Sequence, residues 1–368
     1  MKIARIDIHG YDLSYRYGNY VMSGGQVVTH LPSTVVHIMT DEGIDGFGEV
    51  CPLGPLYLPS HGAGARAALI PIAEALIGAD PTNLGHVHQL MDMALRGHAY
   101  AKSAIDIACW DLLGKATGQD VATLLGGRVQ EQFALYKAVP LGSAEFMRDY
   151  VLERREEGIK RFQLKLGADP YEDAARVRSV VEVLNDDEFV VADANGGWRL
   201  QDAVVAARLI EPLDRVYFEE PCKTLEECLY VRQRTSLPMV LDEVITDVNT
   251  MLRAFHAGGM EAINLKLSKF AGLSGSKLVR DVAGALGLRV TIEDTWGGDL
   301  VTAAVAHLAA STPADNVLTV SFMNDWTNEH IAGYAPRSVA GVGAAPSAPG
   351  LGVEVDIGAL GAPLFSAH

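Results

Sequence analysis

Residues 161–268 contain five short strand-like runs at nearly regular intervals, RFQLKLG (161–167), FVVADAN (189–195), RVYFEEP (215–221), MVLDE (239–243) and AINLKLS (262–268). Three similar runs flank them, FALYKAV (133–139), RVTIED (289–294) and VLTVSF (317–322). Stretches with a helical pattern separate the runs, as in 144–160 and 171–184. Eight strands that alternate with helices predict an α/β fold with a closed, parallel, TIM-type (β/α) barrel over residues 126–324.

A polar residue stands at the end of each of the five central runs. These residues are Lys165, Asp193, Glu219, Asp242 and Lys266, at intervals of 28, 26, 23 and 24 residues. Each interval is about one β/α unit, so we expect the five side chains at one level of the C-terminal rim, where barrels of this type carry their active sites. Singly, each has a simpler explanation as a solvated lysine, a turn residue or a helix cap. Their common phase favours a shared site.

Three neighbouring carboxylates at one rim favour a bound cation. Asp193, Glu219 and Asp242 would repel one another in a shared pocket unless a cation compensates their charge. Three carboxylate oxygens with open water positions suit Mg²⁺. Lys165 and Lys266 would lie on either side of a metal-bound ligand, where the cation lowers the pKa of a lysine towards the range of a general base.

The sequence before the barrel predicts a second, α+β domain. Residues 2–9 alternate like a strand, residues 33–50 are typical of a hairpin that turns at 41–43, and residues 62–125 have a helical, Ala-rich pattern. The Gly-, Pro- and Ala-rich chain from residue 325 onward is expected to pack back onto this part. We therefore predict a capping domain of residues 1–125, completed by residues 325–368, around the barrel.

Composition excludes several classes of function. The 368 residues include 30 Lys and Arg and 46 Asp and Glu, so the formal net charge is −16. This balance disfavours a nucleic-acid partner and an anionic membrane surface. The 4 cysteines are scattered and are expected to be reduced. Residues 1–18 lack the apolar core of a signal peptide, and no segment has the apolar length of a membrane span, so we predict a cytoplasmic protein with no membrane partner.

The motifs LKLG, VADAN, FEEP, LDE and NLKLSK resemble the strand-end motifs of the enolase superfamily, in its mandelate racemase and muconate-lactonizing branch. The resemblance covers nearly the whole chain and implies a modified, enolase-like barrel with an N-terminal α+β capping domain. It implies one Mg²⁺ per subunit, held by Asp193, Glu219 and Asp242, with Lys165 and Lys266 as acid/base catalysts. It also implies a homo-oligomer that removes the proton α to the carboxylate of a small molecule.

One departure from the family bears on the substrate. The branch commonly has K-x-K at the second strand, whereas this chain has Gln163-Leu164-Lys165. Loss of the first lysine is compatible with a substrate that carries its own amine or ammonium charge. Acidic and aromatic groups, which attract an ammonium, occur in 51–61, 293–299 and 324–326, although loop packing would also explain the aromatic ones. The candidate substrate-binding residues are Gln163, Asn195, Tyr57, Asp294, Thr295, Trp296 and Trp326.

These stretches resemble the members of the family that act on proline derivatives. The resemblance implies dehydration of cis-3-hydroxy-L-proline to 1-pyrroline-2-carboxylate with a 2-epimerase side activity, or alternatively 2-epimerisation of proline betaine or 4-hydroxyproline betaine. Two other classes of function fit the sequence less well. A barrel that only binds ligands would need the strand-end residues to be incidental, and a nucleotide-binding enzyme is disfavoured because 272–277 does not match a phosphate loop.

Overall fold

Eight parallel strands form the barrel in the computed structural model, which describes residues 1–25 and 27–368. The strands are β7 (Tyr136–Val139), β8 (Arg161–Lys165), β9 (Phe189–Asp193), β10 (Val216–Glu219), β11 (Met239–Leu241), β12 (Ala262–Lys266), β13 (Arg289–Glu293) and β14 (Val317–Val320). They are hydrogen-bonded in chain order, and a parallel bridge between Leu135 and Val320 joins the two ends of the sheet. The predicted barrel is confirmed.

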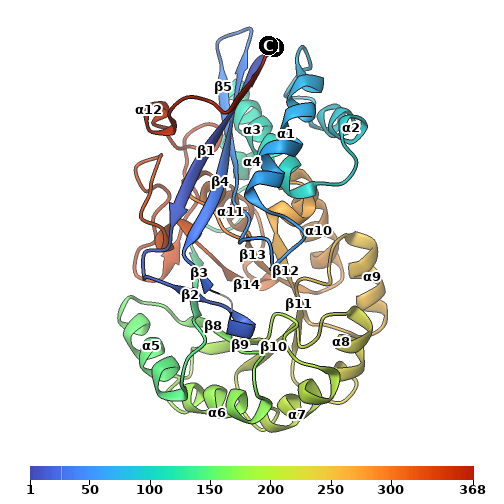
Figure 1. Cartoon of the computed structure of the whole chain (residues 1–368), viewed down its shortest axis with the longest axis vertical. Coiled ribbons are helices and arrows are strands. Elements are labelled where there is room, and N and C mark those ends of the chain that lie inside the picture. The colour runs from blue at the N-terminus through green and yellow to red at the C-terminus, as the bar shows by residue number, and fades with distance from the viewer. Residues whose placement is uncertain (26) are drawn as a thin grey trace.

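Helices that follow the strands surround the barrel (Figure 1). They are α5 (Ala144–Glu156), α6 (Pro170–Val181), α7 (Leu200–Ile210), α8 (Leu225–Arg232), α9 (Val248–His256), α10 (Leu273–Ala285) and α11 (Asp299–Ala310). Several begin where a short polar side chain accepts a hydrogen bond from a backbone N–H of the first turn, as Ser143, Asp169, Thr224 and Asp247 do. These caps fix where α5, α6, α8 and α9 begin, close to the ends of the preceding strands.

A separate antiparallel sheet lies above the barrel in Figure 1, in the order β16–β1–β4–β5. Its strands are β1 (Ile3–Ser14), β4 (His30–Thr40), β5 (Asp45–Val50) and β16 (Phe365–Ala367), and α1 (Gly62–Leu76), α2 (Leu84–Ala94), α3 (Ala99–Thr117) and α4 (Val121–Leu124) complete this part. The predicted turn at 41–43 joins β4 to β5. Ile6 and Ile8 of β1 lie in one buried cluster with Val36 and Ile38 of β4 and with residues of α1 and α3. One face of the sheet is therefore apolar and covered by helices.

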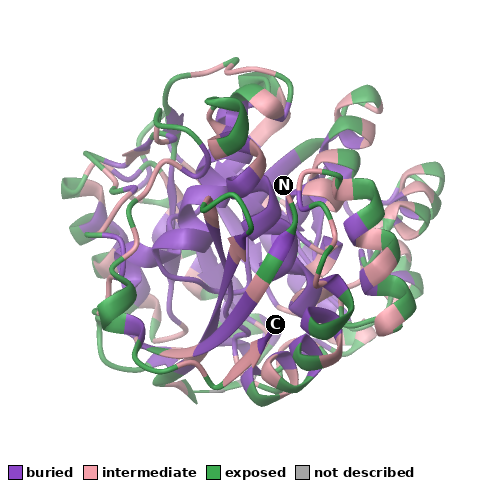
Figure 2. Cartoon of the chain, turned by 90° about the horizontal axis from the view of Figure 1, so that it is seen from above, coloured by how far each residue is buried: buried purple, intermediate pink, exposed green. Residues whose placement is uncertain are grey.

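Helix α3 approaches β5 closely enough to require glycine. A Cβ atom on Gly48 would lie 1.9 Å from the backbone oxygen of Ala104 in α3. Figure 2 shows buried residues concentrated at the centre of the molecule, with exposed residues on the surrounding helices. The described helices include none that is long and apolar enough to cross a membrane. All four cysteines are buried and free, as predicted.

The C-terminal segment contacts both parts of the molecule. Strand β16 pairs with β1, so the two chain ends meet in the capping sheet. Strand β15 (Val342–Gly343) instead pairs with β6 (Phe133–Ala134), which directly precedes the barrel. The segment was expected to pack back onto the first domain, and in the structure it pairs with β1 of that domain and, through Val342 and Gly343, also with residues 133–134. The division at residues 125 and 324 stays a prediction.

Candidate active site

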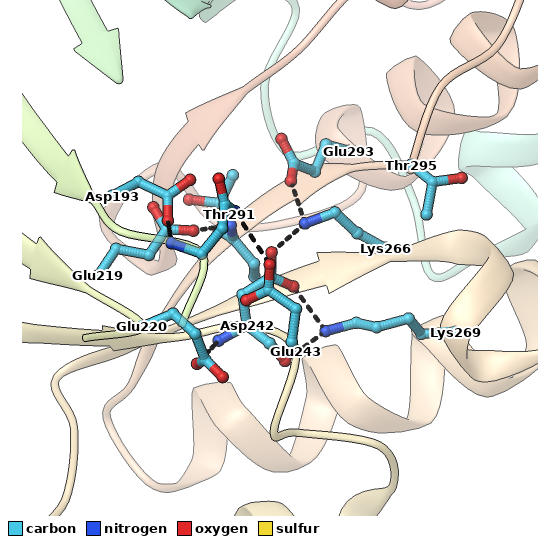
Figure 3. A network of polar contacts seen from close by, with 12 residues as sticks. Asp193, Glu219, Glu220, Asp242, Glu243, Lys266, Lys269, Thr291, Glu293 and Thr295 are labelled. Atoms are coloured by element: carbon cyan, nitrogen blue, oxygen red, sulfur yellow. Dashed lines mark hydrogen bonds and ion pairs between the residues drawn. The ribbon is translucent and has the colours of Figure 1, made fainter. Parts of the chain in front are cut away.

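The five predicted strand-end residues lie together at the C-terminal rim of the barrel. Strand register places Lys165 beside Asp193 and Asp193 beside Glu219. Lys266 ends β12, and Asp242 is the first residue after β11. Figure 3 shows Asp193, Glu219 and Asp242 with their side chains directed towards a common network of polar contacts. The predicted common level of these residues is observed.

Each of the three carboxylates is buried and hydrogen-bonded. Glu219 accepts from Gln163 Nε2 at 3.0 Å and from Asn264 Nδ2 on its other oxygen. Asp242 accepts a hydrogen bond at 2.9 Å from Oη of Tyr57, a residue of the N-terminal part of the chain. Burial, followed by the charges of Asp193 and Asp242, raises the pKa of Glu219 well above its usual value. Burial and the neighbouring carboxylates therefore both disfavour the ionised form of Glu219.

The lysines pair with these carboxylates. Lys165 Nζ lies 2.5 Å from Asp193 Oδ2, and Lys266 contacts both Asp242 and Glu293, the latter at 2.7 Å. Burial alone would lower the pKa of Lys165, but the charges of Asp193, Tyr20 and Glu219 together outweigh it and the pKa is raised. The pKa of Lys266 is raised in the same way, against its burial, by Asp242 and Glu293. With these pairs intact, both lysines hold their protons.

A cavity joins the lysines to the predicted substrate-binding residues. Its lining includes Gln163, Lys165, Lys266, Tyr57, Asp294, Thr295, Trp296 and Trp326. Asp294 accepts hydrogen bonds from Ser268, and burial raises the pKa of Asp294 to about 6. Thr295 donates to the backbone oxygen of Cys51 at 2.9 Å, which fixes the capping loop to the seventh strand end. The cavity is therefore closed by side chains from both parts of the chain.

Aromatic rings form one wall of this cavity. Trp296 and Trp326 meet edge to face with centroids 5.5 Å apart, and Tyr20 packs against Trp296 at 5.3 Å. Lys137 Nζ lies 5.2 Å from the centroid of Trp326, so one ring already has a cation of the protein beside it. Burial lowers the pKa of Lys137 to about 8.

Asn195 donates its backbone N–H to Asp193 Oδ1 at 2.8 Å, but it does not line the cavity of the other candidates. It has φ +45°, accepts from Ser23 Oγ at 2.9 Å and donates to Glu243 Oε1 at 2.9 Å. It lines a neighbouring pocket with Gly196 and Lys223, and among the residues that the structure describes only Tyr57 borders both cavities. The structure thus brings all the predicted substrate-binding residues except Asn195 around one cavity.

The comparisons with known proteins agree with this geometry. Residues 146–359 match the family described as "Enolase C-terminal domain-like", and residues 19–126 match "Mandelate racemase / muconate lactonizing enzyme, N-terminal domain". The chain belongs to the enolase superfamily. Within it, the chain is similar to the cis-3-hydroxy-L-proline dehydratase of Roseibium aggregatum, with 47% identity over 364 residues that cover 99% of each chain.

Solved structures of the enolase superfamily have the same fold. A mandelate racemase/muconate lactonizing enzyme from Roseovarius nubinhibens ISM, solved in complex with magnesium, is 34% identical with a TM-score of 0.96 over 100% of both chains. The N-succinyl Arg/Lys racemase of Bacillus cereus ATCC 14579 is 26% identical with a TM-score of 0.91 over 100% of this chain and 99% of that one.

The three carboxylates at the rim suit Mg²⁺, the ion with which the Roseovarius nubinhibens relative was solved. All three predicted ligands offer carboxylate oxygens, the donors that Mg²⁺ prefers. No lysine or arginine among the described residues lies within ion-pair distance of Glu219, and burial, followed by the charges of Asp193 and Asp242, raises its pKa. Lys165 and Lys266 hold Asp193 and Asp242 in ion pairs, so a bound cation would take over as the partner of these two carboxylates.

Sequence reasoning missed three residues of the network in Figure 3 and its surroundings. Glu293 ends β13 beside Lys266, and the interval of 27 residues from Lys266 could have indicated it. Asn264 lies two residues before Lys266 on the same strand face, as Gln163 does before Lys165. Lys269 donates to Asp242 Oδ1 at 2.8 Å because the 3₁₀ turn Leu267–Phe270 directs it back to the rim.

Proposed function

We propose that this chain dehydrates cis-3-hydroxy-L-proline to 1-pyrroline-2-carboxylate. The observation that carries the proposal is the 47% identity, over 99% of both chains, to a relative named for this activity. The cavity supports it, because Lys165 and Lys266 line the same enclosed space as acidic and aromatic side chains that suit a ring with a charged amine.

The two lysines supply the acid/base chemistry. They stand on β8 and β12, with three strands between them that carry the carboxylates, so they face a bound substrate from different directions. A lysine that has lost its own proton removes the C2 proton of the substrate. We assign the role of principal base to Lys165. The electron pair left at C2 expels the C3 hydroxyl, which takes up a proton and leaves as water. The resulting enamine takes a proton at C3 and loses one from the ring nitrogen, which gives the imine.

The other candidate groups bind and orient the substrate. We assign Asp193, Glu219 and Asp242 to one Mg²⁺, which when bound would offset the charge that develops on the substrate carboxylate. Asp294 and the rings of Trp296 and Trp326 would face the amine. Trp296 Nε1 is buried with no hydrogen-bond partner among the described residues, so it is available to donate to a substrate oxygen. Gln163 would hold Glu219 and, with Tyr57, Thr295 and Asn195, shape the mouth.

A second activity is favoured by the paired lysines. Two bases on different sides of C2 also permit removal of the proton from one face and its return to the other. We therefore propose 2-epimerisation as a side activity, and 2-epimerisation of proline betaine or 4-hydroxyproline betaine as the alternative main reaction. A homo-oligomer and a cytoplasmic location remain predictions.

Proton NMR in D₂O tests the proposal directly. The protein with Mg²⁺ is incubated with cis-3-hydroxy-L-proline, L-proline and proline betaine, each with and without a chelator. We expect loss of the C3 hydroxyl only from the first, and C2 deuterium uptake without elimination from L-proline, which lacks the leaving group. Exchange restricted to the betaine would favour the alternative, and inertness of all three compounds would refute both.

A further inference from the structure

A second cluster of metal-ligand side chains lies in the capping sheet, away from the barrel. Asp7 and His9 on β1 and His37 on β4 each offer one ligand atom, and these atoms all lie within 4.8 Å of one another. Asp7 is directly opposite His37 in the strand register, and His9 follows Asp7 on the same face. This face is the one opposite to Ile6 and Ile8, so the cluster does not belong to the apolar core under α1 and α3.

The three side chains are buried, with exposures of 6% for Asp7, 3% for His9 and 6% for His37. Both ring nitrogens of His9 are buried without a close hydrogen-bond partner among the described residues, although the backbone of Gly361 lies near enough to interact with the ring. Burial of a polar atom without a good partner is unfavourable, so the His9 ring points to a ligand between the strands.

The surrounding contacts prepare the other two side chains as ligands. His37 Nε2 lies 2.9 Å from Asp45 Oδ2, and a carboxylate that accepts from one ring nitrogen leaves the other nitrogen as the electron-pair donor. Asp7 Oδ1 accepts from Arg5 Nε at 2.8 Å and from Ser366 Oγ at 2.6 Å, which leaves its second oxygen for the cluster. This arrangement of oriented ligands is the one that metal sites in proteins use.

We propose that Asp7, His9 and His37 bind a divalent transition-metal ion of the zinc class. Two imidazole nitrogens and one carboxylate oxygen suit Zn²⁺, Co²⁺ or Fe²⁺, whereas Mg²⁺ takes oxygen ligands. The site is therefore chemically distinct from the all-carboxylate site of the barrel. The ion would join β1 to β4, and through the Asp7–Ser366 contact it would also hold β16, which ends the chain. The proposal is independent of the reaction at the barrel rim.

Zinc titration of the full-length, metal-stripped protein tests the site. Millimolar Mg²⁺ is present throughout to occupy the barrel carboxylates, and a chromophoric chelator reports free Zn²⁺. We expect one Zn²⁺ per chain, a rise in the unfolding temperature on binding, and at least a 100-fold loss of affinity in His9→Gln. His86→Gln is the matched control, because His86 is an exposed histidine on α2.

A second measurement does not depend on the folding of a variant. In the wild-type protein, Co²⁺ added under the same conditions should give visible absorption, and X-ray absorption should show two imidazole nitrogens in its first coordination shell. The proposal is overturned if the wild type binds neither ion beyond the barrel site. It is also overturned if binding survives His9→Gln and is lost in Asp193→Asn, since the ion would then occupy the barrel.

Discussion

Because of His307, we expect the folded protein to lose a measurable part of its stability in acid. His307 lies on α11 with no exposed surface, Nδ1 accepts from the backbone N–H of Ala122 at 3.1 Å, and Nε2 donates to the backbone oxygen of Leu351 at 3.0 Å. One ring thus joins the barrel to the N-terminal part and to the C-terminal segment. Burial lowers the pKa of His307 to about 4, although the Leu351 carbonyl and Asp120 act in the opposite direction.

The sign and size of the effect follow from this pKa. An unfolded histidine titrates near pH 6.5, so between about pH 6.5 and pH 4 the unfolded chain binds a proton that the folded chain refuses. Stability therefore falls as the pH is lowered through this window. Linkage of the two pKa values gives a loss of about 2 kcal/mol between pH 7.5 and pH 5, attributable to this residue alone.

Urea denaturation at both pH values measures the loss. His307→Gln retains an acceptor and a donor but does not titrate, so we expect its free energy of unfolding to fall by about 2 kcal/mol less than that of the wild type on acidification. His86→Gln, which alters an exposed histidine, should behave as the wild type does. Parallel pH profiles for wild type and His307→Gln would refute the reasoning.

Two further changes have defined outcomes. In Gly48→Ala, the new Cβ would meet the Ala104 backbone, so we expect a loss of about 3 kcal/mol in thermal unfolding, whereas Gly85→Ala on α2, with no atom within 4 Å, should be neutral or slightly stabilising. Equal unfolding temperatures would contradict the close approach. Tyr57→Phe removes the hydrogen bond to Asp242 and should weaken Mg²⁺ binding about 10-fold or more by calorimetry, while the exposed Tyr171→Phe should not. Unchanged affinity would show that Tyr57 does not orient Asp242.

The barrel and its rim could be predicted from the sequence because both depend on a period. One polar residue per β/α unit marks the strand ends in the chain itself, and parallel pairing then places Lys165, Asp193 and Glu219 side by side. The turn at 41–43 was also predictable, because it depends only on residues that are adjacent in the chain.

Features that depend on strand register, or on an unusual backbone conformation at a single residue, were not predictable in this way. Glu293 contacts Lys266 because β12 and β13 pair in that register, whereas the sequence alone favoured the next residue, Asp294. Asn195 is turned towards Glu243 by a left-handed backbone conformation that the motif does not reveal. The cluster of Asp7, His9 and His37 requires pairing between strands about 30 residues apart in the chain.

The central claim is that the strand-end lysines abstract a proton from the substrate, and C2 deuterium uptake in D₂O tests it most directly. Lys165→Ala, Lys266→Ala and the surface control Lys277→Ala are compared with the wild type under saturating Mg²⁺ and cis-3-hydroxy-L-proline. We expect Lys165→Ala to lose about 10²–10⁴-fold in exchange rate, Lys266→Ala to be impaired in turnover, and Lys277→Ala to be unchanged. Exchange at the wild-type rate in both rim variants would contradict the account.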